Sequence, residues 1–126
     1  MEQIVGNEYG QMLNALAVDI HKITGRWWLN LETGEPIKRN VGELLMLTVS
    51  ELAEAMEGHR KSLMDDKLPH RPMLEVELAD TIIRCLDMGK GLGLDVGGAL
   101  VEKMAYNAVR DDHKIEVRKL ANGKKY

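Results

Sequence analysis

The chain has 126 residues, of which 44% are hydrophobic and 29% charged, and its formal net charge is −3. This size and composition fit one globular domain spanning residues 1–126, and the mildly acidic balance argues against a nucleic-acid partner. The single cysteine, Cys85, excludes an internal disulfide and a cysteine-ligated zinc site. The N-terminal sequence is unlike a signal peptide and no apolar run has membrane-spanning length, so we expect a cytoplasmic protein without a membrane partner.

Hydrophobic residues recur at steps of three and four positions in four segments, which predicts four helices joined by short connectors. Gly25 ends the first segment, and Asn40 with Glu43 three positions later is typical of a capping box that opens the second. Pro72 suits the first turn of the third segment, and Asp95 can cap the fourth. The expected helices cover residues 4–24, 41–61, 73–88 and 96–112, and a charged tail follows at 113–126. Strand signals are scarce, so the predicted fold class is an all-α four-helix bundle.

Two of the predicted helices carry the same pattern of carboxylates. The second contains Glu51 and Glu54, and the third contains Glu77 and Asp80. A spacing of three residues places both acids of a pair on one face of a helix, and hydrophobic residues surround both pairs. If the two helices are antiparallel neighbours, four carboxylates gather, and their repulsion favours a bound cation. Oxygen ligands select Mg²⁺, for which Mn²⁺ can substitute, and Mg²⁺ shares its remaining positions with phosphate oxygens.

These acids have two alternative interpretations. They can be solvated surface residues of a non-catalytic helical interaction module, in which case neither Mg²⁺ nor a nucleotide stabilises the fold. A di-iron carboxylate bundle requires Glu-x-x-His pairs, and here the residues three positions after Glu54 and Glu77 are acidic, which excludes it.

The pattern Glu51-x-x-Glu54, twenty-two residues and then Glu77-x-x-Asp80 resembles the metal-binding signature of the MazG-like all-α nucleoside triphosphate pyrophosphohydrolases. The similarity covers about residues 43–112 and includes LTVSELAEAMEGHRK, EVELADTIIRCLDMGKGLGLD and ALVEKMAYNAVR. It is greatest to the short, single-domain versions carried by bacteriophages.

The resemblance implies a four-helix MazG-like bundle that assembles as a homodimer or a dimer of dimers. It implies hydrolysis of a nucleoside triphosphate between its α and β phosphates, which adjusts or cleanses the nucleotide pool, in the host cytoplasm if the chain is phage-encoded. Glu51, Glu54, Glu77 and Asp80 match the metal ligands, and either Glu51 or Glu54 can also accept the proton of the attacking water.

Cationic and polar residues of two helices are candidates for phosphate binding. Lys103, Asn107 and Arg110 share one face of the fourth helix, and the resemblance places the lysine and the asparagine near the phosphates. Lys61 follows Glu54 by two turns, on nearly the same side. A solvated helix face is the alternative for each of them.

The candidates for nucleobase binding lie in the first forty residues. Asn14 and His21 are seven positions apart on the first helix, and Trp28, or its neighbour Trp27, can stack on a base, although packing explains either tryptophan equally well. The polar groups of Asn14 and His21 favour guanine, as dGTP or GTP. A dUTP- or dCTP-directed diphosphatase of the same superfamily is the alternative.

Overall fold

The computed structural model describes residues 6–126, and this part of the chain is helical with no β-strand. The predicted all-α class is therefore confirmed. The four longer helices are α1 (Gly6–Thr24), α2 (Val41–Lys61), α3 (Met73–Gly91) and α4 (Val96–Val109). Three short segments complete the list, namely the 3₁₀ turns η1 (Gly25–Trp28) and η2 (Asp111–His113) and the helix α5 (Ile115–Arg118).

The predicted helix boundaries are right for one helix and wrong at the ends of two others. α2 covers residues 41–61 as predicted, and Asn40 accepts the Glu43 amide at 2.9 Å, as a capping residue should. Residues 4 and 5 of the first predicted helix lie outside the described part, and the charged tail contains η2 and α5.

α3 continues to Gly91 and does not stop at residue 88, because Gly91 packs against the Trp28 ring within the helix. The chain turns only at Gly93, whose φ of +70° favours glycine. α4 ends at Val109 and not at residue 112, because Arg110 adopts extended backbone and its guanidinium pairs with Asp112.

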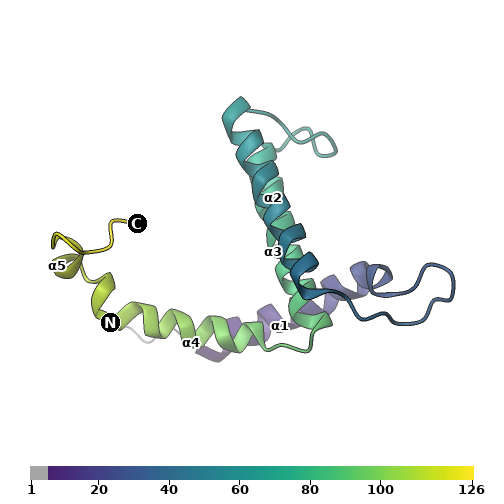
Figure 1. Cartoon of the computed structure of the whole chain (residues 1–126), viewed down its shortest axis with the longest axis horizontal. Helices are drawn as coiled ribbons and strands as arrows, with labels where there is room; N and C mark the ends of the chain where they lie inside the picture. The colour runs from purple at the N-terminus through teal and green to yellow at the C-terminus, as the bar shows by residue number, and fades with distance from the viewer. Residues whose placement is uncertain (1–5) are drawn as a thin grey trace. The chain divides into compact units, whose positions relative to one another are not determined.

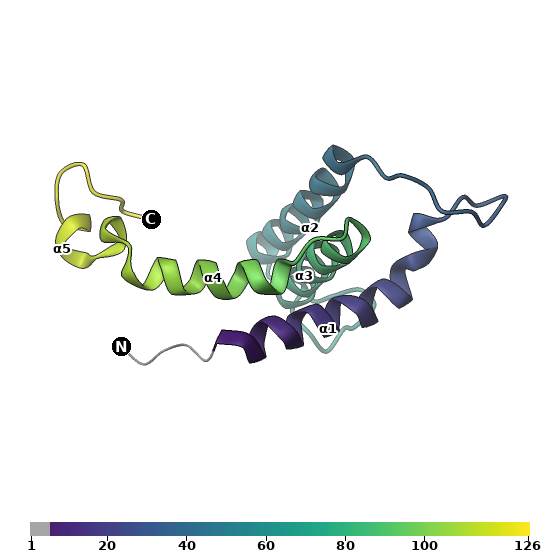
Figure 2. The ribbon, with the colours of Figure 1, turned by 90° about the horizontal axis from the view of Figure 1, so that it is seen from below.

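The chain comprises two compact units, residues 15–94 and residues 95–126 together with the described part of 1–14. The larger unit is built on α2 and α3, which lie side by side as an antiparallel hairpin (Figures 1 and 2). The connector between them is held by Asp65, whose buried carboxylate accepts the Lys67 and Leu68 amides.

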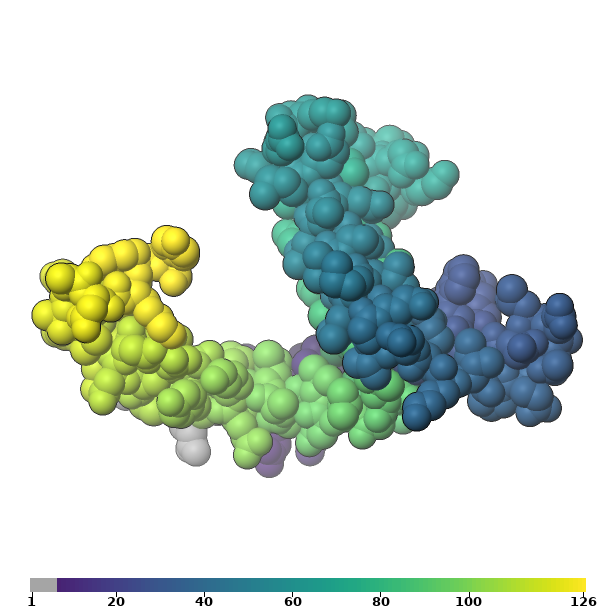
Figure 3. Space-filling model, viewed as in Figure 1, coloured from purple at the N-terminus to yellow at the C-terminus, as the bar shows by residue number. Residues whose placement is uncertain are grey.

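The α2–α3 hairpin buries few apolar side chains. Leu44, Ala55 and Leu86 are buried, and Gly58 lets α2 approach Met73 closely. Most other large hydrophobic side chains of these two helices are exposed, and the α2 side of the hairpin is visible in Figure 3. No helix within residues 6–126 has the length and apolar character needed to cross a bilayer.

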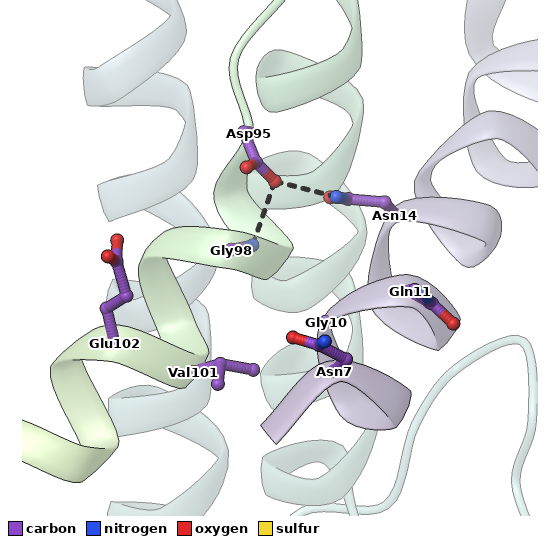
Figure 4. Close-up of a pocket in the computed structure, with 8 residues that line it drawn as sticks. All are labelled: Asn7, Gly10, Gln11, Asn14, Asp95, Gly98, Val101 and Glu102. Atoms are coloured by element: carbon purple, nitrogen blue, oxygen red, sulfur yellow. Dashed lines mark hydrogen bonds between the residues drawn. The ribbon is translucent and has the colours of Figure 1, made fainter.

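In the smaller unit, the start of α1 packs against the start of α4. Gly10 and Gly97 approach so closely that a Cβ atom on either would meet the backbone of the other. Figure 4 shows Asn14 beside the first turn of α4, where Asp95 caps the helix by accepting the Gly98 amide at 2.8 Å.

Candidate metal centre

Three of the four predicted metal ligands meet in the middle of the α2–α3 hairpin. Glu51 on α2 and Glu77 and Asp80 on α3 each place a carboxylate oxygen within 4.8 Å of the other two. The fourth, Glu54, has an exposed side chain, but it lies close enough to Glu77 to affect its pKa. The antiparallel pairing of two helices with the same three-residue spacing produces this arrangement, as the sequence predicts.

Glu77 is the most constrained member of the cluster. The residue is only 7% exposed, and its Oε2 atom is buried without a hydrogen-bond partner among the described residues. A buried, unpartnered carboxylate oxygen is unfavourable, because it has lost water and gained nothing in return. Burial and the neighbouring Glu51 and Glu54 carboxylates raise the pKa of Glu77 to about 8.

The other two carboxylates respond differently to their surroundings. Burial alone would raise the pKa of Glu51, but it is outweighed by the hydrogen bond and positive charge of Arg84 together with hydrogen bonds from Glu77 and Glu54, so this pKa lies below its ordinary value. Arg84 Nε donates to Glu51 Oε1 at 2.7 Å. The pKa of Asp80 is raised by burial and by the charge of Glu51. Without a cation at neutral pH, therefore, Glu51 is ionised and Glu77 holds a proton.

The donor set fits a hard divalent cation. Carboxylate oxygens are the ligands of Mg²⁺, which holds them at about 2.1 Å, so that two ligand oxygens are at most about 4.2 Å apart. The oxygens of Glu51, Glu77 and Asp80 lie within 4.8 Å of one another, so a small closure of the side chains brings them to that geometry. A cation there would also supply the partner that Glu77 Oε2 lacks.

A cleft of about 480 Å³ opens beside the carboxylate cluster within the larger unit. Glu51 and Asp80 line one part of it, and Arg84 lies beside them. Trp27 and Arg39 line another part, and Trp27 is 63% exposed. The cleft therefore joins carboxylates, cations and an exposed aromatic ring in one space.

Two of the predicted nucleobase-binding residues contact Asp87, which also lines this cleft. His21 Nδ1 lies 2.7 Å from Asp87 Oδ1, and Trp28 Nε1 donates to Asp87 Oδ2 at 3.0 Å. Thr24 donates its hydroxyl to the same carboxylate. These bonds anchor η1 on α3 and engage the indole N–H of Trp28, so Trp27 is the tryptophan whose ring is available to the cleft.

The third predicted nucleobase-binding residue, Asn14, belongs to the smaller unit. Its Oδ1 accepts the Gly97 amide at 2.9 Å. Its Nδ2 donates to Asp95 at 2.8 Å (Figure 4). The side chain thus joins α1 to the start of α4. The guanine preference depends on Asn14 and His21, and the Asn14 amide group and the Nδ1 atom of His21 are engaged in these intramolecular bonds.

Three of the four predicted phosphate-binding residues have partners nearby. Lys61 pairs with Glu57 one turn earlier on α2. On α4, Lys103 lies with its Nζ 5.0 Å from the Tyr106 ring centre, and Arg110 binds Asp112. The fourth, Asn107, has a buried Oδ1 without a hydrogen-bond partner in the described part of the chain.

Sequence reasoning did not select Asp87 or Arg39 as site residues. Asp87 follows Asp80 by seven positions, which places both on nearly the same side of α3. This spacing is the sequence feature that indicates Asp87 as a neighbour of the site. Arg39 precedes the Asn40 cap and gave no such signal, because its position depends on a hydrogen bond to the Trp27 carbonyl, twelve residues away.

No protein-family model matches the chain, and neither a curated protein nor a solved structure matches it.

Proposed function

We propose that the chain is a Mg²⁺-dependent nucleoside triphosphate diphosphatase, which hydrolyses a nucleoside triphosphate to the monophosphate and pyrophosphate. The observation that carries the proposal is the gathering of Glu51, Glu77 and Asp80, with the buried Glu77 oxygen unpartnered, beside an open cleft. The resemblance of the two Glu-x-x-acid motifs to the MazG-like enzymes supports the same function.

In this proposal the three carboxylates hold the cation, which neutralises phosphate charge and lowers the pKa of a bound water. The ionised Glu51 and the exposed Glu54 are the candidates for accepting the proton of that water. Arg84 holds Glu51 in its ionised form and, because 40% of its side chain is exposed, can also reach a phosphate oxygen.

The same cleft has features that suit the rest of a nucleotide. The exposed ring of Trp27 offers a face on which a base can stack. Arg39 lies at that part of the cleft, with its Nη1 donating to the Trp27 carbonyl at 3.0 Å. The proposed substrate therefore extends from the carboxylates, which face the phosphates, to Trp27, which faces the base.

The test is a panel of all ribo- and deoxynucleoside triphosphates with Mg²⁺ or Mn²⁺, with the products separated by chromatography. We expect monophosphate and pyrophosphate in equal amounts from at least one substrate, and loss of most turnover in the variant Glu54→Gln with the fold retained. Glu57→Gln, on the same helix but paired with Lys61, is the matched control and should keep its activity. Release of inorganic phosphate and a nucleoside diphosphate would indicate cleavage of a different bond. No turnover of any triphosphate would favour the non-catalytic interaction module.

A further inference from the structure

The guanidinium group of Arg39 is held in a fixed orientation in the cleft of the larger unit. Its Nη1 donates to the Trp27 carbonyl at 3.0 Å, and its Nη2 donates to Glu43 Oε1 at 3.3 Å. Its Cζ lies 5.7 Å from the centre of the Trp28 ring, and only 15% of the side chain is exposed. Because these contacts come from both η1 and α2, they fix the plane of the group.

The same guanidinium group keeps hydrogen-bonding capacity that the fold does not use. An arginine has N–H donors on Nε and on both Nη atoms and has no acceptor. The two bonds to the Trp27 carbonyl and Glu43 use one N–H of each Nη atom. The Nε–H and the second N–H of each Nη atom make no hydrogen bond within residues 6–126. Since Arg39 lines the cleft, these donors are available to a molecule bound there.

Trp27 offers a stacking surface next to these donors. Its carbonyl accepts the bond from Arg39, its ring is 63% exposed, and both residues line the cleft. Stacking on an aromatic ring accepts every base, because each base has a π face. A purine covers more of an indole ring than a pyrimidine does, so Trp27 favours purines. Stacking alone does not separate guanine from adenine.

The edge of the base that carries N7 separates the two purines. Guanine presents two adjacent acceptors there, O6 and N7, whereas adenine presents the N7 acceptor beside an amino group that is a donor. The parallel N–H groups of a guanidinium match two adjacent acceptors, and against adenine one of them faces another donor. Cytosine also has two adjacent acceptors, but its single ring covers less of the indole face.

We propose that Arg39 is the specificity-determining residue of the cleft, where it donates to O6 and N7 of a guanine that stacks on Trp27. The substrate class is then a guanine or other 6-oxopurine nucleotide. The inference rests on the proposed function for a nucleotide as the ligand, but it does not require hydrolysis. Arg39 also supplies free donors for guanine, whereas the Asn14 amide and the His21 Nδ1 atom are engaged in bonds within the chain.

Calorimetric titration of the wild-type chain with nucleoside monophosphates in Mg²⁺ tests the proposal without turnover. IMP keeps O6 and N7 and lacks only the 2-amino group, so it should bind within about threefold of GMP. In 7-deaza-GMP a C–H group replaces N7, and this ligand and AMP should each bind about tenfold more weakly than GMP. Equal affinity for GMP and 7-deaza-GMP would overturn the proposal, as would AMP or CMP binding as tightly as GMP or no binding of GMP at millimolar concentration.

A variant of Arg39 gives the complementary measurement on the protein. Arg39→Lys keeps the positive charge but replaces the planar fork with a single donating atom. It should bind GMP and AMP with affinities that agree within about threefold, while circular dichroism shows the helix content of the wild type. Glu43→Gln is the matched control, because it removes the ion pair and leaves the guanidinium in place, so it should keep the preference for GMP. A folded Arg39→Lys variant with the wild-type preference would contradict the role of Arg39.

Turnover assays separate this inference from the proposed function. Equal kcat/KM values for GTP, dGTP and ATP would contradict the specificity role of Arg39 and leave the diphosphatase activity standing. Binding of GMP that depends on Arg39, without hydrolysis of GTP or dGTP, would leave the guanine site standing and contradict the diphosphatase activity.

Discussion

Replacing Glu77 with glutamine should have opposite effects on the stability of the metal-free protein and on its response to Mg²⁺. The pKa of Glu77 is about 8 in the folded chain against an ordinary value of 4.5. Because the folded pKa is raised, this group costs the fold no stability below pH 4.5, where it is protonated in both the folded and the unfolded chain. The free energy of unfolding then falls as the pH rises from 4.5 through 8. Glutamine is neutral at every pH and avoids the loss.

The size of the effect follows from the difference in pKa. At 1.36 kcal/mol per pKa unit, folding at pH 7 costs about 3 kcal/mol as an upper limit, because Glu77 must take up a proton that the unfolded chain has released. Above pH 8 the limit is about 5 kcal/mol. Glu77→Gln should therefore unfold at higher urea concentration than the wild type in EDTA, by a margin that grows between pH 5 and pH 8.

Mg²⁺ should reverse the order of the two proteins. A cation that binds only the folded state stabilises the wild type by about 2.7 kcal/mol when its concentration is one hundred times its dissociation constant. Glu77→Gln has lost a charged ligand and should gain little. Glu75→Gln, on the same helix but exposed and paired with Arg71, is the control and should behave as the wild type does. Equal stabilisation of Glu77→Gln and the wild type by Mg²⁺, or lower stability of Glu77→Gln in EDTA at pH 8, would refute the reasoning.

Three further predictions concern the surroundings of the site. Gly91→Ala should destabilise the chain by about 1–3 kcal/mol in urea unfolding, because the added Cβ would collide with the Trp28 ring. The pKa of Asp87 is lowered because its hydrogen bonds outweigh its burial, so the stability it contributes is present above pH 3.8 and lost as the pH falls below that value. Asp87→Asn should therefore show a smaller fall in the urea midpoint between pH 6 and pH 3 than the wild type. Arg84→Gln should lower the stability in EDTA by about 1 kcal/mol, since Glu51 loses its cationic partner, and Mg²⁺ should restore it.

Each of these variants has a control or a contrary result. Gly25→Ala has open space around its Cβ, so it should cost much less than Gly91→Ala, and equal losses would show that no ring packs on α3. Asp19→Asn changes a 74% exposed carboxylate and should leave the acid response unchanged. If Arg84→Gln were as stable as the wild type in EDTA, the pairing with Glu51 would not hold the cluster together.

The local features of the fold were predictable because they depend on neighbours in the sequence. Asn40 and Glu43 are three positions apart, so the start of α2 follows from capping chemistry alone. The carboxylates at equal spacing on two successive helices indicated their meeting, because a connector as short as residues 62–72 favours an antiparallel hairpin.

The features that were not predicted depend on contacts between distant residues. Gly91 extends α3 because the Trp28 ring packs on it, and nothing in the glycine-rich sequence itself distinguishes a packing position from a helix stop. Asp87 collects three donors that lie between 59 and 66 residues earlier in the chain. Such partners become visible only when the helices are placed in three dimensions.

The most direct test of the proposed metal centre is anomalous scattering from a crystal grown with Mn²⁺. We expect an anomalous peak bonded to carboxylate oxygens of Glu51, Glu77 and Asp80 at about 2.1–2.2 Å, and its absence from crystals of Glu77→Gln. If Mn²⁺ bound elsewhere, or if these three carboxylates remained without a cation at millimolar Mn²⁺, the central claim would be wrong.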